Sequence, residues 1–170
     1  PPPHHSSAAS DVYKRQRPVF LMRDPIERII SSARMQRRKQ GQFDSAGEVT
    51  DLRELCRQRP ERIALRGDYG HTLKALDAAF GLSHCFVDLY EQLFTPTCWI
   101  RLCRVLNIPY EEPQWEQKLN VSRTDTALPE DVLAELGQWQ APALAAVRQN
   151  CPQLDLDRFW PTAVRWCPPQ

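Results

Sequence analysis

The chain has 170 residues, of which 42% are hydrophobic and 25% are charged, with 22 lysine and arginine residues against 21 aspartate and glutamate residues. This composition is typical of a globular domain, and it excludes a disordered tail, a collagen-like repeat and a strongly basic nucleic-acid-binding module. No uncharged apolar run approaches the roughly 18–20 residues that a membrane-spanning helix needs. One domain with a hydrophobic core is therefore expected.

The first sixteen residues differ in character from the rest of the chain. Residues 6–16 (SSAASDVYKRQ) resemble the in-frame translation of a transposase-type sequencing adapter, as in a reading frame assembled from metagenomic reads. We therefore interpret 1–16 as an artefactual or disordered leader, and 17–170 as a partial domain whose native gene extends upstream. A natural leader or a tag remnant is the alternative. Without the leader, cationic and anionic residues number 20 each, so the net charge is zero.

A short strand followed by a helix is predicted at the start of the domain. Residues 18–22 (PVFLM) form an apolar run between two arginines, which indicates a buried strand. Asp24 is a favourable N-cap for the helix, Pro25 suits its first position, and Glu27 stands where a capping box needs its reciprocal acceptor. Apolar residues then recur at helical spacing as far as Lys39.

The rest of the chain alternates helices with one further strand. The predicted elements are a short polar helix over 51–59, a helix over 69–80 capped by Asp68 and ended by Gly81, a strand over 84–89, a helix opened by Thr95 and Pro96, and a long helix from 128 that Pro142 kinks or restarts. The tail, with its tryptophans, is expected to pack against the domain. This order predicts an α/β fold with a parallel sheet flanked by helices.

The cysteines and histidines give no metal-binding pattern. None of the six cysteines forms a C-x-x-C pair, and only two histidines lie outside the leader. No metal site is therefore predicted. Reduced thiols are expected, with disulfide bonds as the alternative.

The junction of the first strand and helix carries the clearest chemical signal. Arg23 lies at the carboxyl end of the strand, where open α/β sheets bind ligands, and the helix N-terminus beside it offers unpaired N–H groups. Ser31 lies about 140° around the helix from Ile26, away from the apolar stripe. Arg23 and Ser31 can thus converge on one phosphate. The alternative is an arginine that is solvated or paired with Asp24 or Glu27.

Two further groups of charged residues have more than one interpretation. Arg34 and residues 37–39 cluster near the end of the first helix, either as a solvated face that suits the helix dipole or as a rim that attracts an anionic ligand. Glu91 is interpreted as a structural residue that caps a turn after the second strand, and the alternative is a general base.

The motif R-D-P-x-E-R-x-x-S after an apolar strand, residues 23–31, resembles the 3′-phosphate-binding signature of sulfotransferases that use 3′-phosphoadenosine 5′-phosphosulfate (PAPS). It is close to the bacterial carbohydrate-type branch of that family. Later segments resemble the family's other motifs in order, with Asn107 in place of the usual glycine: 66–69 (RGDY), 87–93 (VDLYEQL), 102–110 (LCRVLNIPY) and 118–123 (KLNVSR). The resemblance covers roughly residues 18–160.

The resemblance implies a P-loop NTPase-like sulfotransferase fold, truncated at its N-terminus. It implies transfer of a sulfuryl group from PAPS to a hydroxyl or amine of an acceptor, a small molecule or a glycan, leaving 3′-phosphoadenosine 5′-phosphate (PAP). Arg23 and Ser31 would bind the 3′-phosphate. The other residues that the resemblance brings near the nucleotide are Arg66, Tyr69, Asn120, Ser122 and Arg123.

Two parts of the family pattern have no counterpart here, namely the 5′-phosphosulfate loop and the catalytic base, both expected upstream of Arg17. No catalytic residue is therefore assigned, and we expect this chain alone to transfer no sulfuryl group. His71 and His84 are interpreted as structural or exposed. A P-loop-type phosphotransferase and a non-enzymatic basic-helix module that binds nucleic acid are the alternatives. The expected location is the bacterial cytoplasm, with neither membrane nor nucleic acid as a partner.

Overall fold

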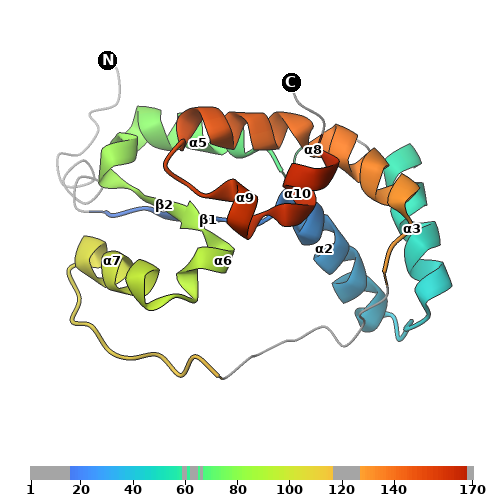
Figure 1. Ribbon diagram of the computed structural model, residues 1–170, viewed down its shortest axis with the longest axis horizontal. Helices are drawn as coiled ribbons and strands as arrows, with labels where there is room; N and C mark the ends of the chain where they lie inside the picture. The colour runs from blue at the N-terminus through green and yellow to red at the C-terminus, as the bar shows by residue number, and fades with distance from the viewer. Residues whose placement is uncertain (1–15, 59–60, 62–64, 66, 117–126, 168–170) are drawn as a thin grey trace, which may run out of the picture.

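The computed structural model describes residues 16–58, 61, 65, 67–116 and 127–167, and most of its elements are helices. In chain order they are β1 (Val19–Met22), α2 (Pro25–Lys39), α3 (Ser45–Gln58), α5 (Tyr69–Phe80), the 3₁₀ helix η1 (Leu82–His84), β2 (Phe86–Leu89), α6 (Tyr90–Leu93), α7 (Pro96–Leu106), α8 (Glu130–Asn150), α9 (Leu156–Phe159) and α10 (Pro161–Trp166). Figure 1 shows how they are arranged.

The two strands form a small parallel sheet, as the order of the predicted elements indicated. Val19 of β1 is in register with Phe86 of β2, and Met22 is in register with Leu89. The connection between the strands contains α2, α3 and α5, so it is a long crossover of the kind that parallel strands require. Because both strands run the same way, the residues that follow Met22 and Leu89 meet at one edge of the sheet.

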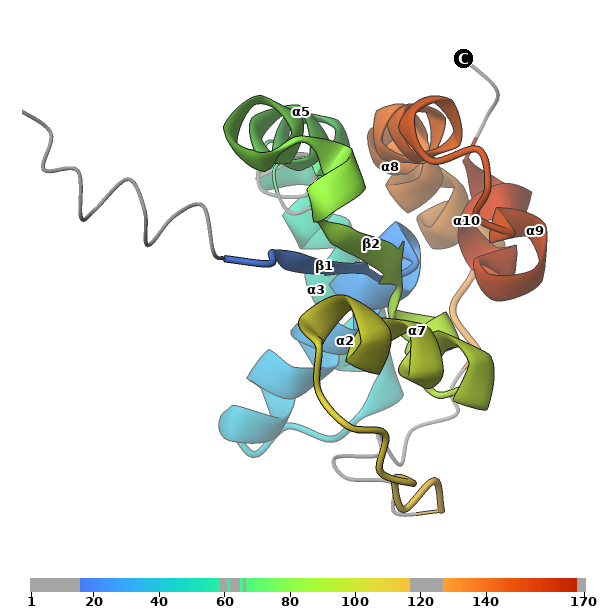
Figure 2. The ribbon, with the colours of Figure 1, turned by 90° about the vertical axis from the view of Figure 1, so that its left-hand side faces the viewer.

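Helices lie on both sides of this sheet. In Figures 1 and 2, α5 and α8 lie on one side and α7 lies on the other. The main core contains Met22 and Leu89 from the strands together with Leu136 from α8, all fully buried. A smaller cluster packs Leu102 of α7 against Phe86 of β2. Burial of these apolar side chains is the main force that fixes the helices on the sheet.

The boundaries of α2 and α5 follow local signals and confirm the predictions. Asp24 caps α2, because its Oδ1 accepts the N–H groups of Ile26 at 3.0 Å and Glu27 at 3.2 Å. Asp68 caps α5 through the N–H of His71 at 2.8 Å. Gly81 ends α5 with φ 74°, a left-handed conformation that glycine adopts without a steric penalty.

Two predicted boundaries in the first half of the chain were wrong. Helix α3 begins at Ser45 rather than at 51, because the Asp44 carboxylate accepts the N–H of Gly47 at 2.5 Å and caps an earlier turn. Strand β2 begins at Phe86 rather than at 84, because residues 82–84 form η1 before the chain extends.

Helix α8 runs through Pro142 as one helix, so of the two predicted effects of Pro142, a kink or a restart, the restart was wrong. Pro142 is exposed, while Ala141 and Ala143 beside it are buried. Packing on both sides of the proline therefore outweighs the loss of one backbone hydrogen bond.

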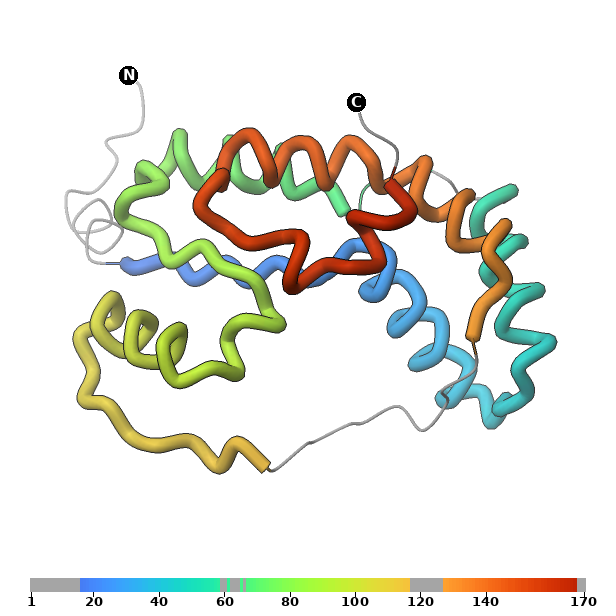
Figure 3. The backbone as a smooth tube through the Cα atoms, viewed as in Figure 1, coloured from blue at the N-terminus to red at the C-terminus, as the bar shows by residue number. Residues whose placement is uncertain are grey.

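The C-terminal segment returns to the edge of the sheet. Figure 3 shows it crossing from the end of α8 to the point where β1 leads into α2. Trp160, between α9 and α10, is fully buried, which confirms that the tail packs against the domain.

The described helices include none that is both long and apolar enough to cross a membrane. All six cysteines are free, and all but Cys85 are buried. Within the described ranges, no group of three or more His, Cys, Asp or Glu side chains could hold a metal ion.

Candidate functional site

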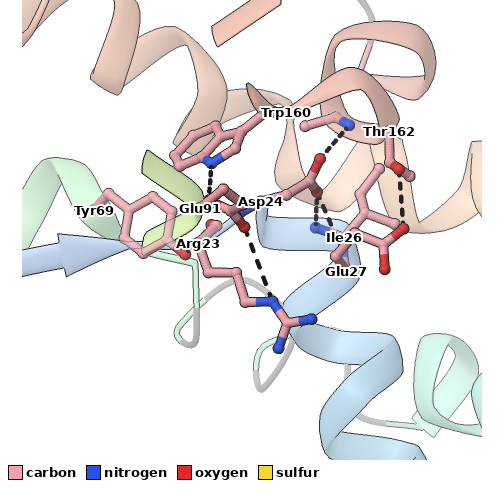
Figure 4. Close-up of polar contacts among 9 residues, drawn as sticks. Arg23, Asp24, Ile26, Glu27, Tyr69, Glu91, Trp160 and Thr162 are labelled. Carbon is pink, nitrogen blue, oxygen red and sulfur yellow. Dashed lines mark hydrogen bonds and ion pairs between the residues drawn. The ribbon is translucent and has the colours of Figure 1, made fainter. Parts of the chain in front are cut away.

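Arg23 and Glu91 face each other at the carboxyl edge of the two strands (Figure 4). Arg23 follows β1, and Glu91 lies in the first turn of α6 after β2. Arg23 Nε is 3.9 Å from Glu91 Oε1, with the two side chains 38% and 27% exposed. The Arg23 guanidinium also lies 5.8 Å from the centre of the Tyr90 ring. No other described carboxylate forms an ion pair with Arg23, so its one ion pair is long and partly open to water.

Glu91 connects three segments of the chain. Its Oε1 accepts the backbone N–H of Asp24 at 3.2 Å, and its Oε2 accepts the indole N–H of Trp160 at 3.0 Å. Glu91 is thus structural, as interpreted, but these contacts join the end of β1 to the C-terminal segment rather than capping a turn of its own segment.

Asp24 forms a second connection to the C-terminal segment. It is only 2% exposed, and its Oδ2 accepts the backbone N–H of Ala163 at 2.9 Å. Burial raises the pKa of Asp24, and the N–H groups of Ala163, Glu27 and Ile26 oppose that rise. Beside it, Glu27 Oε1 accepts the Thr162 hydroxyl at 2.9 Å. The predicted reciprocal bond of a capping box is therefore absent, because Glu91 already accepts the Asp24 N–H.

The N-terminus of α2 does not offer free N–H groups, so that expectation was wrong. The N–H of Asp24 donates to Glu91, and the N–H groups of Ile26 and Glu27 donate to the Asp24 side chain. The N–H of Arg28 donates to the Asp24 carbonyl, and Pro25 has no N–H. The buried Asp24 occupies the place that an external anion would take at a helix N-terminus. Any anion bound here must rely on side chains.

Tyr69 supports the backbone of Arg23. Its hydroxyl donates to the Arg23 carbonyl at 2.6 Å, and its ring packs against Phe20 and Trp160 with centroids 6.1 and 5.8 Å away. Burial raises the pKa of Tyr69, partly offset by the Arg28 guanidinium, so the hydroxyl keeps the proton that it donates. The structure thus places Tyr69 beneath Arg23, with only 3% of its surface exposed.

Within the described part of the chain, the structure does not bring the other residues predicted from the sequence into contact with Arg23. Ser31 lies two turns along α2 and is half-buried. Among the described residues, no hydrogen bond involves its hydroxyl and none joins it to Arg23 or Tyr69. Four further residues lie outside the described ranges: Arg66, Asn120, Ser122 and Arg123. His71 and His84 are both exposed.

Two arginines of the basic cluster at the end of α2 form ion pairs with carboxylates. Arg37 lies 2.6 Å from a carboxylate oxygen of Asp44 and 2.6 Å from one of Asp51. Arg34 Nε lies 2.6 Å from Glu48 on α3. Arg34 and Arg37 therefore join α2 to α3, whereas Arg38 and Lys39 are exposed, as the solvated-face interpretation expected.

A cavity of about 430 Å³ lies between α2, the start of α8 and α10. Glu27 and Thr162 line it together with Arg165 and Trp166. It reaches neither Arg23 nor Ser31, so it is separate from the Arg23 site.

Asp24, Glu91 and Trp160 were not recognised from the sequence as parts of one site. The pair Tyr90–Glu91 directly after the second strand was the available signal, since parallel strands bring their carboxyl ends to one edge. Nothing local indicated Trp160, which lies 69 residues from its partner Glu91.

Comparisons of the chain with protein-family models, with curated proteins and with solved structures find no significant match.

Proposed function

We propose that this chain is part of a PAPS-dependent sulfotransferase, in which Arg23 and Ser31 bind the 3′-phosphate of PAPS or PAP. One observation carries the proposal. Arg23 stands at the carboxyl edge of two parallel strands and is half-exposed, and among the described residues its one ion pair is 3.9 Å long. Such an arginine keeps guanidinium N–H donors available for a phosphate, and the planar guanidinium can donate two parallel hydrogen bonds to phosphate oxygens. The R-D-P-x-E-R-x-x-S motif supports the same assignment.

In this proposal Arg23 and Ser31 contact the phosphate, and Tyr69 supports the backbone of Arg23. PAPS supplies an activated sulfuryl group when bound. The Arg23 guanidinium provides charge-assisted hydrogen bonds, and the Ser31 hydroxyl adds one neutral donor. Tyr69 fixes the Arg23 backbone through its carbonyl. Because the backbone donors of α2 are already satisfied, affinity for the 3′-phosphate depends on these two side chains.

The wider proposal follows the resemblance. The β1–α2–β2 unit would belong to a P-loop NTPase-like sulfotransferase fold in the bacterial cytoplasm, and the acceptor would be a hydroxyl or amine of a small molecule or glycan. A nucleic-acid-binding basic helix is less consistent with the contacts, because Arg34 and Arg37 are paired with carboxylates of α3 and its preceding turn.

Calorimetry with PAP and 5′-AMP tests the proposal, because the two nucleotides differ in the 3′-phosphate. Arg23→Ala should weaken PAP binding by about 1.5–3 kcal/mol, the scale of a hydrogen bond to a charged group, and leave 5′-AMP binding unchanged. The control is Arg38→Ala, an exposed arginine of the same helix. Equal PAP affinity in the Arg23→Ala and unmodified chains, or no PAP binding by the unmodified chain, would refute the assignment.

A further inference from the structure

We propose that Trp160 and Glu91 are positioning residues that orient the Arg23 guanidinium toward its phosphate ligand, an inference that rests on the proposed function. The two carboxylate oxygens of Glu91 contact different partners (Figure 4). Oε2 accepts the indole N–H of Trp160 at 3.0 Å, while Oε1 accepts the Asp24 N–H at 3.2 Å and lies 3.9 Å from Arg23 Nε.

These contacts fix the carboxylate independently of the guanidinium. The Trp160 and Asp24 bonds restrain both oxygens, so a rotation of Glu91 toward Arg23 would break them. Its contact is with Nε, on the inner side of the guanidinium. The terminal amino groups of Arg23 then point away from Glu91, as the close-up shows. At 3.9 Å the contact is an ion pair and not a hydrogen bond, and its attraction favours Arg23 rotamers that keep Nε near Glu91, so less side-chain entropy is lost when the terminal groups bind a phosphate.

The burial of Trp160 shows why its N–H matters. The side chain is fully buried and packs against Tyr69, which itself bonds to the Arg23 carbonyl. A buried indole N–H needs an acceptor, and Glu91 supplies it. Phenylalanine would fill much of the same space without this bond. Core filling and positioning by Trp160 can therefore be separated by one substitution.

Two substitutions that preserve charge test the pair. Trp160→Phe removes the indole N–H donor and the smaller ring of the indole. Glu91→Asp keeps the carboxylate but shortens the side chain. Each should weaken PAP binding by about threefold to tenfold, the range for one net hydrogen bond, and change 5′-AMP binding by less than about twofold. The effect on PAP should disappear when Arg23→Ala is also present, because coupled residues give non-additive effects.

Matched controls come from the same chain. Trp166→Phe changes another tryptophan of the C-terminal segment, whose indole N–H has no acceptor among the described residues. Glu54→Asp shortens an exposed glutamate of α3. Both should leave PAP affinity unchanged. If Trp160→Phe does not fold, Glu91→Asp provides the same comparison.

The outcomes separate this inference from the proposed function. Equal losses for PAP and 5′-AMP, no loss at all, or a loss that persists in Arg23→Ala would overturn the positioning role while the PAP-binding assignment stands. If the unmodified chain does not bind PAP, the proposed function fails. The NMR signal of Arg23 Nε–H in the ligand-free protein tests whether Trp160 affects the Arg23 side chain without any nucleotide. A shift of this signal in Trp160→Phe but not in Trp166→Phe supports positioning, and an unchanged signal overturns it.

Discussion

The two ends of helix α2 each place an arginine near carboxylates, but the contacts differ in number and length. At the C-terminal end, Arg37 is 6% exposed and lies 2.6 Å from both Asp44 and Asp51. Just before the N-terminal end, Arg23 is half-exposed and lies 3.9 Å from Glu91, the one described carboxylate with which it forms an ion pair. An arginine with two short ion pairs has its donors engaged within the protein, whereas an arginine with one long ion pair keeps donors for a ligand.

The buried partner also differs between the two ends. At the C-terminal end the buried group is Arg37, and the side chains of its partners Asp44 and Asp51 are 65% and 50% exposed. At the N-terminal end the buried group is the acid Asp24, which backbone N–H groups satisfy. Arg34 and Arg37 therefore stabilise the contact of α2 with α3, whereas Asp24, whose oxygens accept backbone N–H groups, forms no ion pair with Arg23 among the described residues.

The largest expected effect is at Asp24. Asp24→Ala removes the cap of α2 and leaves the buried N–H of Ala163 without an acceptor, so the free energy of unfolding should fall by about 2–4 kcal/mol. Asp68→Ala is the control, since Asp68 caps α5 but is exposed, and about 1 kcal/mol is expected there. Urea unfolding measures both. Equal losses for the two variants would show that the contact with α10 contributes nothing.

A smaller effect on stability is expected at the other end of the helix. Arg37→Ala should lower the urea midpoint, because two charge-assisted contacts between α2 and the start of α3 are lost. The loss should shrink in high salt, which screens the exposed Asp44 and Asp51. PAP affinity should stay unchanged, in contrast to Arg23→Ala. A variant at Arg37 that binds PAP less tightly while remaining folded would break the distinction between the two ends.

The smallest effect is a pH dependence that arises from Asp24. Burial raises its pKa in the folded protein above the ordinary value of 3.8, so the folded state binds more protons between these two values. The stability that Asp24 contributes is then complete below 3.8 and is lost as the pH rises through the folded-state pKa. Asp24→Asn does not titrate. The unfolding free energy of the unmodified chain minus that of Asp24→Asn should therefore decrease as the pH rises above 3.8 and through the raised folded-state pKa of Asp24. Urea titrations that show an increase would contradict this.

Local signals predicted the helix boundaries that depend on neighbours in sequence. Asp24 and Pro25 were sufficient for the start of α2, and Gly81 for the end of α5, because a cap needs only the adjacent turn. The start of α3 was predicted wrongly although its cap, Asp44, is also local, and the continuity of α8 was missed because packing against the rest of the domain decides it. Pro142 neither ends nor restarts α8, since buried residues on both sides keep the helix continuous.

The candidate site shows the same division. The sequence indicated Arg23 at a strand end and Ser31 two turns later, but it assigned the N–H groups of α2 to an external ligand. In the structure Asp24 and Glu91 occupy those donors. The family resemblance singled out Tyr69 as a nucleotide-binding residue, and the fold adds that it is buried and donates to the Arg23 carbonyl.

The short apolar strands and the capped helices could be predicted from the sequence, because each depends on residues within one or two turns of one another, and the parallel order followed from the sequence of elements along the chain. Which arginine keeps its donors depends instead on contacts between distant segments. Arg23 and Arg37 have the same chemistry, and they differ because α3 brings carboxylates to one while Trp160, from the far end of the chain, restrains the carboxylate that faces the other. Partners separated by tens of residues meet only when the core has formed.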